Sequence, residues 1–298
     1  MFKIFKLSVI YLITVLSLST QAENRIEIFF GSNNLSFDRH SNDFIGSNEA
    51  AGLKSKNIGG YLARDLDENT AISILGKYDE YNTDSIISLP EDDSPKDSIT
   101  LEATLMRNIF QNSLGGATVF LGDIETEQNG ENVNKRIQGY NLSFVNEIRK
   151  LTYMLTMGKQ TSGSVEAQDS VRNTKYSGVV LNYDFNNNID LGFKLSEFVG
   201  NEYDEKTIKS EQTSRVSSIF ADYNLSNAII RAGYKLYDNE REDVEGNNIG
   251  EIEDANGEAF FFSLSLPFGQ TSSKKERILI TEKPDIVEFS AIMGSIGD

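Results

Sequence analysis

The sequence of 298 residues contains no cysteine, no tryptophan, one histidine and only four prolines. Without cysteine the chain has no disulfide, no thiolate metal site and no thiol nucleophile. A single histidine argues against imidazole-rich zinc sites and against most histidine-based catalysis. The scarcity of proline permits long strands, because proline cannot donate a hydrogen bond to a strand ladder.

Positive charge is also scarce, since 28 Lys and Arg stand against 45 Asp and Glu, for a formal net charge of -17. A nucleic-acid binder needs a basic face, so no nucleic-acid partner is expected. With 39% hydrophobic residues, the chain is too apolar for a disordered protein and too polar for a bundle of membrane helices. Glycine, phenylalanine and tyrosine are plentiful instead, at 23, 18 and 12 residues.

The first 22 residues have the pattern of a cleaved secretory signal. Lys3 and Lys6 precede an apolar run over residues 7–18, and Ala22 ends a short stretch that suits signal peptidase. An uncleaved anchor is the alternative, but the run is short for a membrane span. No later stretch is long and apolar enough to cross as a helix, so the exported chain is either soluble or a β-barrel.

The remainder of the sequence alternates at period two, which is typical of strands. Leu191, Phe193 and Leu195, for example, alternate with Gly192 and Lys194. Strands are predicted near residues 25–37, 50–64, 70–79, 98–110, 115–127, 135–145, 150–161, 173–185, 189–201, 211–224, 228–238 and 258–268. Many have ten or more residues, as tilted membrane strands need.

The connections between these strands alternate in length. Tight turns are predicted at residues 65–69, 111–114, 146–149, 186–188 and 225–227. Longer polar loops are predicted at 38–49, 80–97, 128–134, 162–172, 202–210 and 239–257. With these features the chain resembles the Gram-negative outer-membrane β-barrel proteins, porin-like in the broad sense, over residues 25–268. No motif identifies a subfamily.

The resemblance implies an all-β fold, a single antiparallel up-and-down transmembrane barrel of about 12 strands in the cell outer membrane. It also implies contact with outer-membrane lipid and lipopolysaccharide, and with the barrel-assembly machinery. Residues 258–268 resemble the closing strand of such barrels, which usually ends the chain. The expected domains are therefore a signal peptide (1–22), the barrel (23–268) and a periplasmic C-terminal extension (269–298).

The tail has two further interpretations, a plug in the lumen or a contact with a periplasmic partner, because part of it is apolar. The alternative to the membrane barrel is a soluble fold, a periplasmic β-sandwich or lipocalin-like binding protein with its apolar phase inward. Glycines on the polar phase favour the membrane barrel, because they suit a crowded lumen. They are Gly158, Gly178, Gly192 and Gly233.

The sequence offers little sign of chemistry. His40 stands beside Ser41, and strand alternation would separate the two, so no catalytic residue, cofactor or protein-held metal is predicted and the chain is not expected to be an enzyme. Acidic residues gather in the predicted loops 80–97 and 239–257. They suggest divalent-cation binding beside lipopolysaccharide or, more simply, solvated loops.

A set of charged residues on the inward phase of four consecutive strands is predicted to line the lumen. The set is Asp184, Asp190, Lys194, Asp222, Arg231 and Lys235. It suits either a pore lining or a structural charge network. The first predicted function is accordingly a channel for small hydrophilic solutes. The alternatives are a structural or adhesive surface barrel with a filled lumen, and the soluble binding protein.

Overall fold

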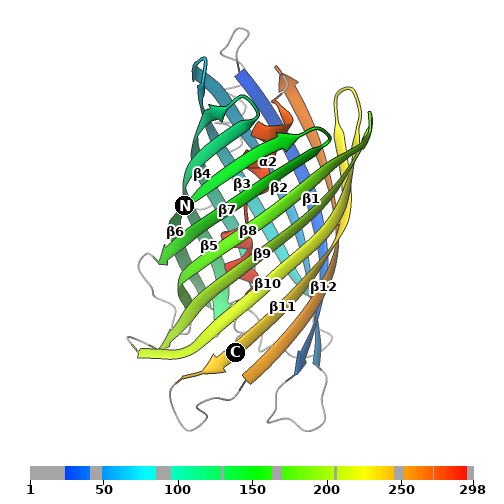
Figure 1. The fold of residues 1–298 in the computed structure, drawn as a ribbon. Helices are drawn as coiled ribbons and strands as arrows, with labels where there is room; N and C mark the ends of the chain where they lie inside the picture. The colour runs from blue at the N-terminus through cyan, green and yellow to red at the C-terminus, as the bar shows by residue number, and fades with distance from the viewer. Residues whose placement is uncertain are drawn as a thin grey trace.

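The computed structural model describes residues 24–40, 49–84, 95–128, 131–162, 170–204, 207–244, 252–270 and 272–293. This part of the chain forms twelve strands and two short helices (Figure 1). The strands are β1 (Asn24–His40), β2 (Glu49–Asp67), β3 (Thr70–Asp84), β4 (Pro95–Phe110), β5 (Ser113–Gln128), β6 (Glu131–Ile148), β7 (Leu151–Ser162), β8 (Ser170–Asn186), β9 (Ile189–Asp204), β10 (Thr207–Asn224), β11 (Ile229–Asp243) and β12 (Ile252–Gly269). The helices are α2 (Lys274–Thr281) and α3 (Ile286–Met293).

The strands close into one antiparallel barrel. Each strand pairs with its neighbour in sequence, and β12 pairs with β1 from Arg25↔Gly269 to His40↔Asp254. Closure leaves no sheet edge, so the wall satisfies its own backbone hydrogen bonds, as a membrane requires. The predicted up-and-down barrel of about 12 strands is confirmed, and β12 is its closing strand.

The apolar phase of the strands faces outward. On β9, Leu191, Phe193 and Leu195 are exposed, whereas Gly192 and Lys194 point to the interior. The same holds around the barrel, where many large apolar side chains remain exposed, Phe185 at 57% and Val119 at 62% among them. A soluble sandwich or lipocalin-like cup would turn this phase inward. The structure therefore contradicts that alternative.

Outward charges begin where the apolar run ends. On the outer surface, Arg215 of β10 pairs with Glu197 of β9 at 3.0 Å, and both side chains are largely exposed. From Ile189 to Leu195 the outward positions of β9 are apolar, and Glu197 is the next outward residue. An apolar band bounded by charge matches the hydrocarbon layer of a bilayer.

Tight turns join the strands at one end of the barrel, called the turn end. At the β8–β9 turn the Asn186 Oδ1 accepts hydrogen bonds from the backbone N–H groups of Asn188 and Ile189, which fixes the reversal. Arg149 adopts a left-handed φ of 57° in the β6–β7 turn. All five predicted tight turns are present, and they gather at this end.

The opposite end, called the loop end, departs from the predicted boundaries. Strands continue through most of the loops expected at 128–134 and 202–210, because paired strands extend beyond the apolar band. Of the acidic loops expected at 80–97 and 239–257, residues 85–94 and 245–251 lie outside the described residues. The predicted cation binding there remains a prediction.

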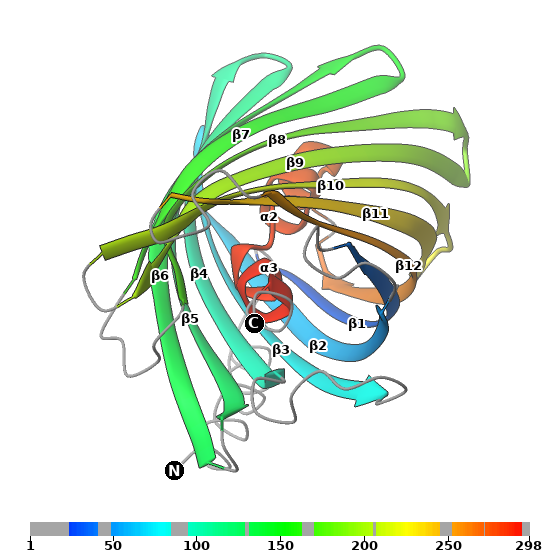
Figure 2. The ribbon, with the colours of Figure 1, turned by 90° about the horizontal axis from the view of Figure 1, so that it is seen from below.

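After β12 the chain turns back into the barrel. Gly269 has a φ of +76°, a conformation that favours glycine at the reversal. Residues 272–293, called the inner segment from here on, lie inside the wall, as the view along the barrel shows (Figure 2). No helix in the described ranges is long and apolar enough to cross a membrane.

The place of the inner segment corrects the sequence-based assignment of this part of the tail. A periplasmic extension is the wrong description, and the plug interpretation agrees with the structure. The physical reason is burial: Leu279 and Val287 are fully buried between the segment and the wall. Burying their apolar surface in the lumen removes it from water, which lowers the free energy of the fold.

Candidate functional site

The predicted lumen residues form two rows across β8–β11. The first row lies near the turn end, where Asp184 faces Asp190, Asp190 faces Asp222, and Asp222 faces Arg231. We call it the acidic row. Three carboxylates in register on neighbouring strands repel one another unless cations stand close by.

The second row lies four residues further from the turns. Lys194 of β9 and Lys235 of β11 both pair in register with Ser218 of β10. At about 3.3 Å per residue, this basic row is roughly 13 Å along the strands from the acidic row. The wall therefore changes sign with depth, from negative at the turn end to positive inside.

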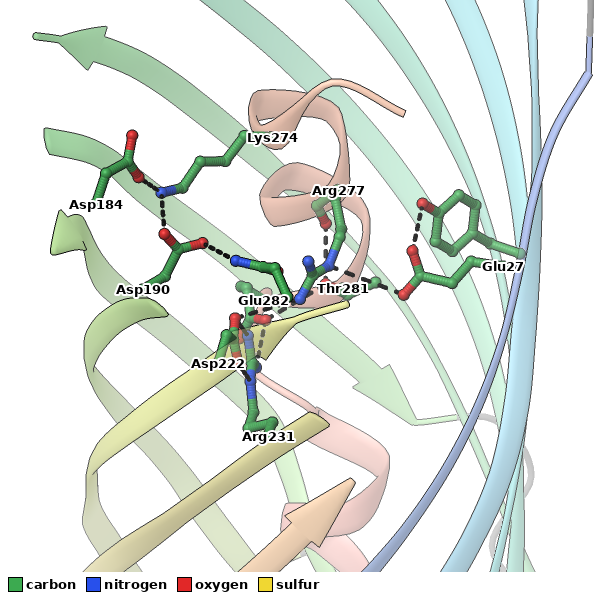
Figure 3. Close-up of polar contacts among 11 residues, drawn as sticks. Glu27, Asp184, Asp190, Asp222, Arg231, Lys274, Arg277, Thr281 and Glu282 are labelled. Carbon is green, nitrogen blue, oxygen red and sulfur yellow. Dashed lines mark hydrogen bonds and ion pairs between the residues drawn. The ribbon is translucent and has the colours of Figure 1, made fainter. Parts of the chain in front are cut away.

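The first helix of the inner segment places two cationic side chains beside the acidic row. Its N-cap is Ser273, whose side chain and that of Glu276 form a capping box. Lys274 then pairs with both Asp184 and Asp190, the latter at 3.4 Å. Arg277, one turn on, reaches Asp222 at 3.3 Å (Figure 3). The repulsion within the acidic row is thereby neutralised.

The end of the first helix and the second helix carry carboxylates to cations of the wall. Glu282 accepts a hydrogen bond from Arg231 at 2.5 Å, while the same guanidinium also binds Asp222 (Figure 3). Glu288 pairs with Lys235 at 3.2 Å and, across the lumen, with Lys77 of β3 at 3.3 Å. The charge order of the inner segment is the complement of the charge order of the wall.

The opposite wall, β4–β7, holds the inner segment by apolar packing. Leu279 of α2 lies against Gly116, and a Cβ at that glycine would be 2.7 Å from the leucine. Val287 of α3 lies against Gly122 in the same way, at 2.5 Å. Glycine at these positions lets the helices approach the wall closely, and larger side chains would push them away.

A cavity of about 200 Å³ remains between the inner segment and the rest of the wall. It is lined by charged, polar and aromatic side chains of β1–β4 and β9–β12, with the linker between the two helices along one side. The inner segment is therefore packed tightly on one side of the lumen and bridged by long charged side chains on the other.

Electrostatics keep both linking glutamates ionised. Burial alone would raise the pKa of Glu282, but the charges of Arg231 and Lys194 outweigh it and lower that pKa below its ordinary value. Burial likewise opposes the charge of Glu288, and Lys235 and Lys77 overcome it, so its pKa is also lowered. Both groups are anions at neutral pH.

All six sequence-predicted residues contact the inner segment. Lys194 does so through its ammonium, which donates to the backbone carbonyl of Lys283 at 3.0 Å. The sequence analysis missed the partners on the tail and four charged wall residues. Arg25 pairs with Glu276, Glu27 with Arg277, Lys77 with Asp285 and Glu288, and Glu102 with Lys283. The charge order of the tail, basic before acidic, was the available signal.

The histidine that the sequence analysis weighed for chemistry lies apart from this charged site. His40 is the last residue of β1, and Ser41 lies outside the described ranges. Among the described residues no group of three or more histidine, aspartate or glutamate side chains is arranged to hold a metal ion.

Comparisons with known proteins rest on the fold. No family model matches the sequence, and no curated protein sequence matches it. The structure is similar to that of an outer membrane channel from Pseudomonas putida F1, with a TM-score of 0.60 and 14% identity, over 84% of this chain and 97% of that one. The chain has an outer-membrane β-barrel fold.

Two other solved barrels are less similar. A FadL homologue of Pseudomonas aeruginosa has a TM-score of 0.46 and 10% identity, over 83% of this chain and 90% of that one. The toluene transporter TodX of Pseudomonas putida has a TM-score of 0.45 and 8% identity, over 84% and 91%.

Proposed function

We propose that this protein is an outer-membrane channel through which small hydrophilic solutes pass beside the inner segment. The observation that carries the proposal is the cavity of about 200 Å³ lined by side chains of both charges, on the side of the lumen away from the apolar packing. The outward apolar band supports a position in the outer membrane, in contact with lipid.

The contacts on the cavity side are ion pairs. Arg231–Glu282 and Lys235–Glu288 join long, largely buried side chains, and a charged or polar solute at the cavity can take the place of either partner. The packing of Leu279 and Val287 on the other wall has no such substitute in water. The inner segment can therefore keep its apolar anchor while the charged side gives way to a passing solute.

A second function is favoured by that same apolar packing. Gly116 and Gly122 receive Leu279 and Val287 so closely that the segment packs against this wall as a core would. A barrel of this kind would be a structural or adhesive surface protein, with its function in the loops rather than in the lumen.

Single-channel recording in planar bilayers separates the two functions. Heat-modifiable gel mobility first shows that the full chain is a folded barrel. We expect stable conductance steps, and liposome swelling in small neutral sugars that falls as the sugar becomes larger. A folded barrel that gives neither conductance nor swelling would overturn the channel and support the structural barrel.

A further inference from the structure

The charges around the cavity pair off with one exception. Each lining carboxylate has a cation partner: Glu27 has Arg277, Glu102 has Lys283, Glu282 has Arg231, Asp285 has Lys77, and Glu288 has Lys77 and Lys235. Lys194 also lines the cavity, and no described carboxylate lies within ion-pair distance of its ammonium. It is the one lining cation in the described ranges that forms no ion pair, although the charge of Glu282 acts on it from beyond that distance.

The surroundings leave Lys194 free to bind an anion. Its ammonium has three donors, and the structure uses one of them, for the carbonyl of Lys283. The carboxylates that face it from the inner segment are Glu282, Asp285 and Glu288, and each is engaged by a different cation. Ser218 follows Lys194 in the basic row and also lines the cavity.

The rest of the cavity supplies apolar and polar surface for the body of a ligand. Phe220, Phe261 and Phe29 contribute aromatic rings to its lining, and the guanidinium of Arg231 lies 3.9 Å from the centre of the Phe220 ring. On the far side Thr100 is only 3% exposed, and its hydroxyl has no hydrogen-bond partner among the described residues.

We propose that this cavity is a binding site for small organic anions, with the carboxylate at Lys194 and an apolar body against the phenylalanine rings. The cavity is smaller than the roughly 300–1,000 Å³ of a drug-sized site, so a single-ring acid is a fitting probe. The inference deepens the proposed function by naming a solute class. It is tested by equilibrium binding, which does not depend on conductance.

The experiment measures benzoate binding to the full chain in detergent by isothermal titration calorimetry. Benzyl alcohol and benzylamine serve as the neutral and cationic analogues of similar size. We expect benzoate to bind more tightly than either analogue. We also expect Lys194→Gln to weaken benzoate binding about tenfold or more, and Lys194→Arg to retain most of it, because a hydrogen bond to a charged group contributes about that much.

The matched control is Lys175→Gln, which removes one positive charge from an exposed position of β8 away from the cavity. It should leave benzoate affinity unchanged. No saturable benzoate binding to the wild type, equal affinity for benzoate and benzyl alcohol, or equal benzoate affinity in wild type and folded Lys194→Gln would each overturn the site. Should Lys194→Gln not fold, the comparison of the three ligands on the wild type decides. Benzoate binding by a barrel that does not conduct would keep the site and contradict only the channel.

Discussion

At the scale of single residues, the side to which a residue points decides its effect. Phe193 stands in the middle of the outward apolar run of β9, between Leu191 and Leu195. We expect Phe193→Arg to cost about 2–4 kcal/mol, because that position lies near the bilayer midplane. Leu225→Arg, at a turn, should cost about 0–1 kcal/mol. Urea unfolding of both variants in lipid vesicles measures the difference, and equal losses would contradict the assigned lipid face.

The ion pairs also differ in how much they contribute to stability, and burial rather than distance decides the contribution. Glu288→Gln leaves Lys77 and Lys235 without their shared carboxylate inside the lumen, and we expect it to lower the free energy of unfolding by about 1.5–3 kcal/mol. Glu197→Gln breaks the exposed pair with Arg215 and should cost about 0–1 kcal/mol. Thermal unfolding compares the two, and a greater loss for Glu197→Gln would be inconsistent with the buried bridge.

Acid should loosen the inner segment through the same glutamates. The pKa values of Glu282 and Glu288 are lower in the folded protein than the ordinary value of about 4.3, so their charges stabilise the fold above that pH. The stabilisation is lost as the pH falls from there through the lowered values. The midpoint of unfolding should therefore fall more steeply below about pH 4 in the wild type than in Glu288→Gln. Parallel curves would show that Glu288 does not titrate this way.

At the scale of elements, the charge order of wall and inner segment acts as a register. Lys274 and Arg277 pair with carboxylates of the acidic row. Glu282 pairs with Arg231 at the end of that row, and Glu288 pairs with Lys235 deeper in the barrel. A shift of the segment along the axis would bring like charges together, which costs free energy at close range. The order of charges thus sets how far the segment enters, while the glycines of β5 set how closely it packs.

Removing the wall cations of this register should open the cavity side. In Arg231→Ser/Lys235→Ser, Glu282 loses Arg231, Glu288 loses Lys235, and Asp222 loses one of its two cations. We expect larger conductance steps and a rise in cation preference, because the carboxylates remain. Arg215→Ser/Lys175→Ser removes the same charge from exposed positions and should change neither. Unchanged conductance and selectivity in the first variant would mean that these cations do not border the path.

Among the elements, the strands could be predicted from the sequence and the place of the inner segment could not. Strand positions followed from alternation, which is local, and Asp184, Asp190 and Arg231 could be placed in rows because tight turns fix the register of a hairpin. The inner segment could not be placed, because its helices are short and their partners lie far away in the sequence. Lys274 and Asp184, for example, are 90 residues apart.

At the scale of the whole molecule, the outer surface of the barrel is apolar, as in a membrane protein, and its lumen is charged and partly filled. The wall closes with β12 on β1, and the chain then supplies its own lumen contents. The position in the lumen explains why the residues after the closing strand include both apolar and charged side chains. Their apolar side chains anchor the segment, and their charged ones border the cavity.

The most direct measurement of this account is a disulfide between the inner segment and the wall. The natural chain has no cysteine, and a Cβ at Gly122 would lie 3.4 Å from the Cβ of Val287, near the separation of about 3.5–4.5 Å that a disulfide needs. Gly192→Cys/Val287→Cys is the control, because Gly192 faces Phe220 instead.

Both variants would be oxidised as full-length, folded barrels in outer-membrane preparations and compared on denaturing gels with and without reductant. The account predicts that Gly122→Cys/Val287→Cys forms an internal cross-link that migrates faster and is reversed by reductant, while the control does not. A folded Gly122→Cys/Val287→Cys barrel that forms no cross-link would place the segment outside the lumen and contradict the account.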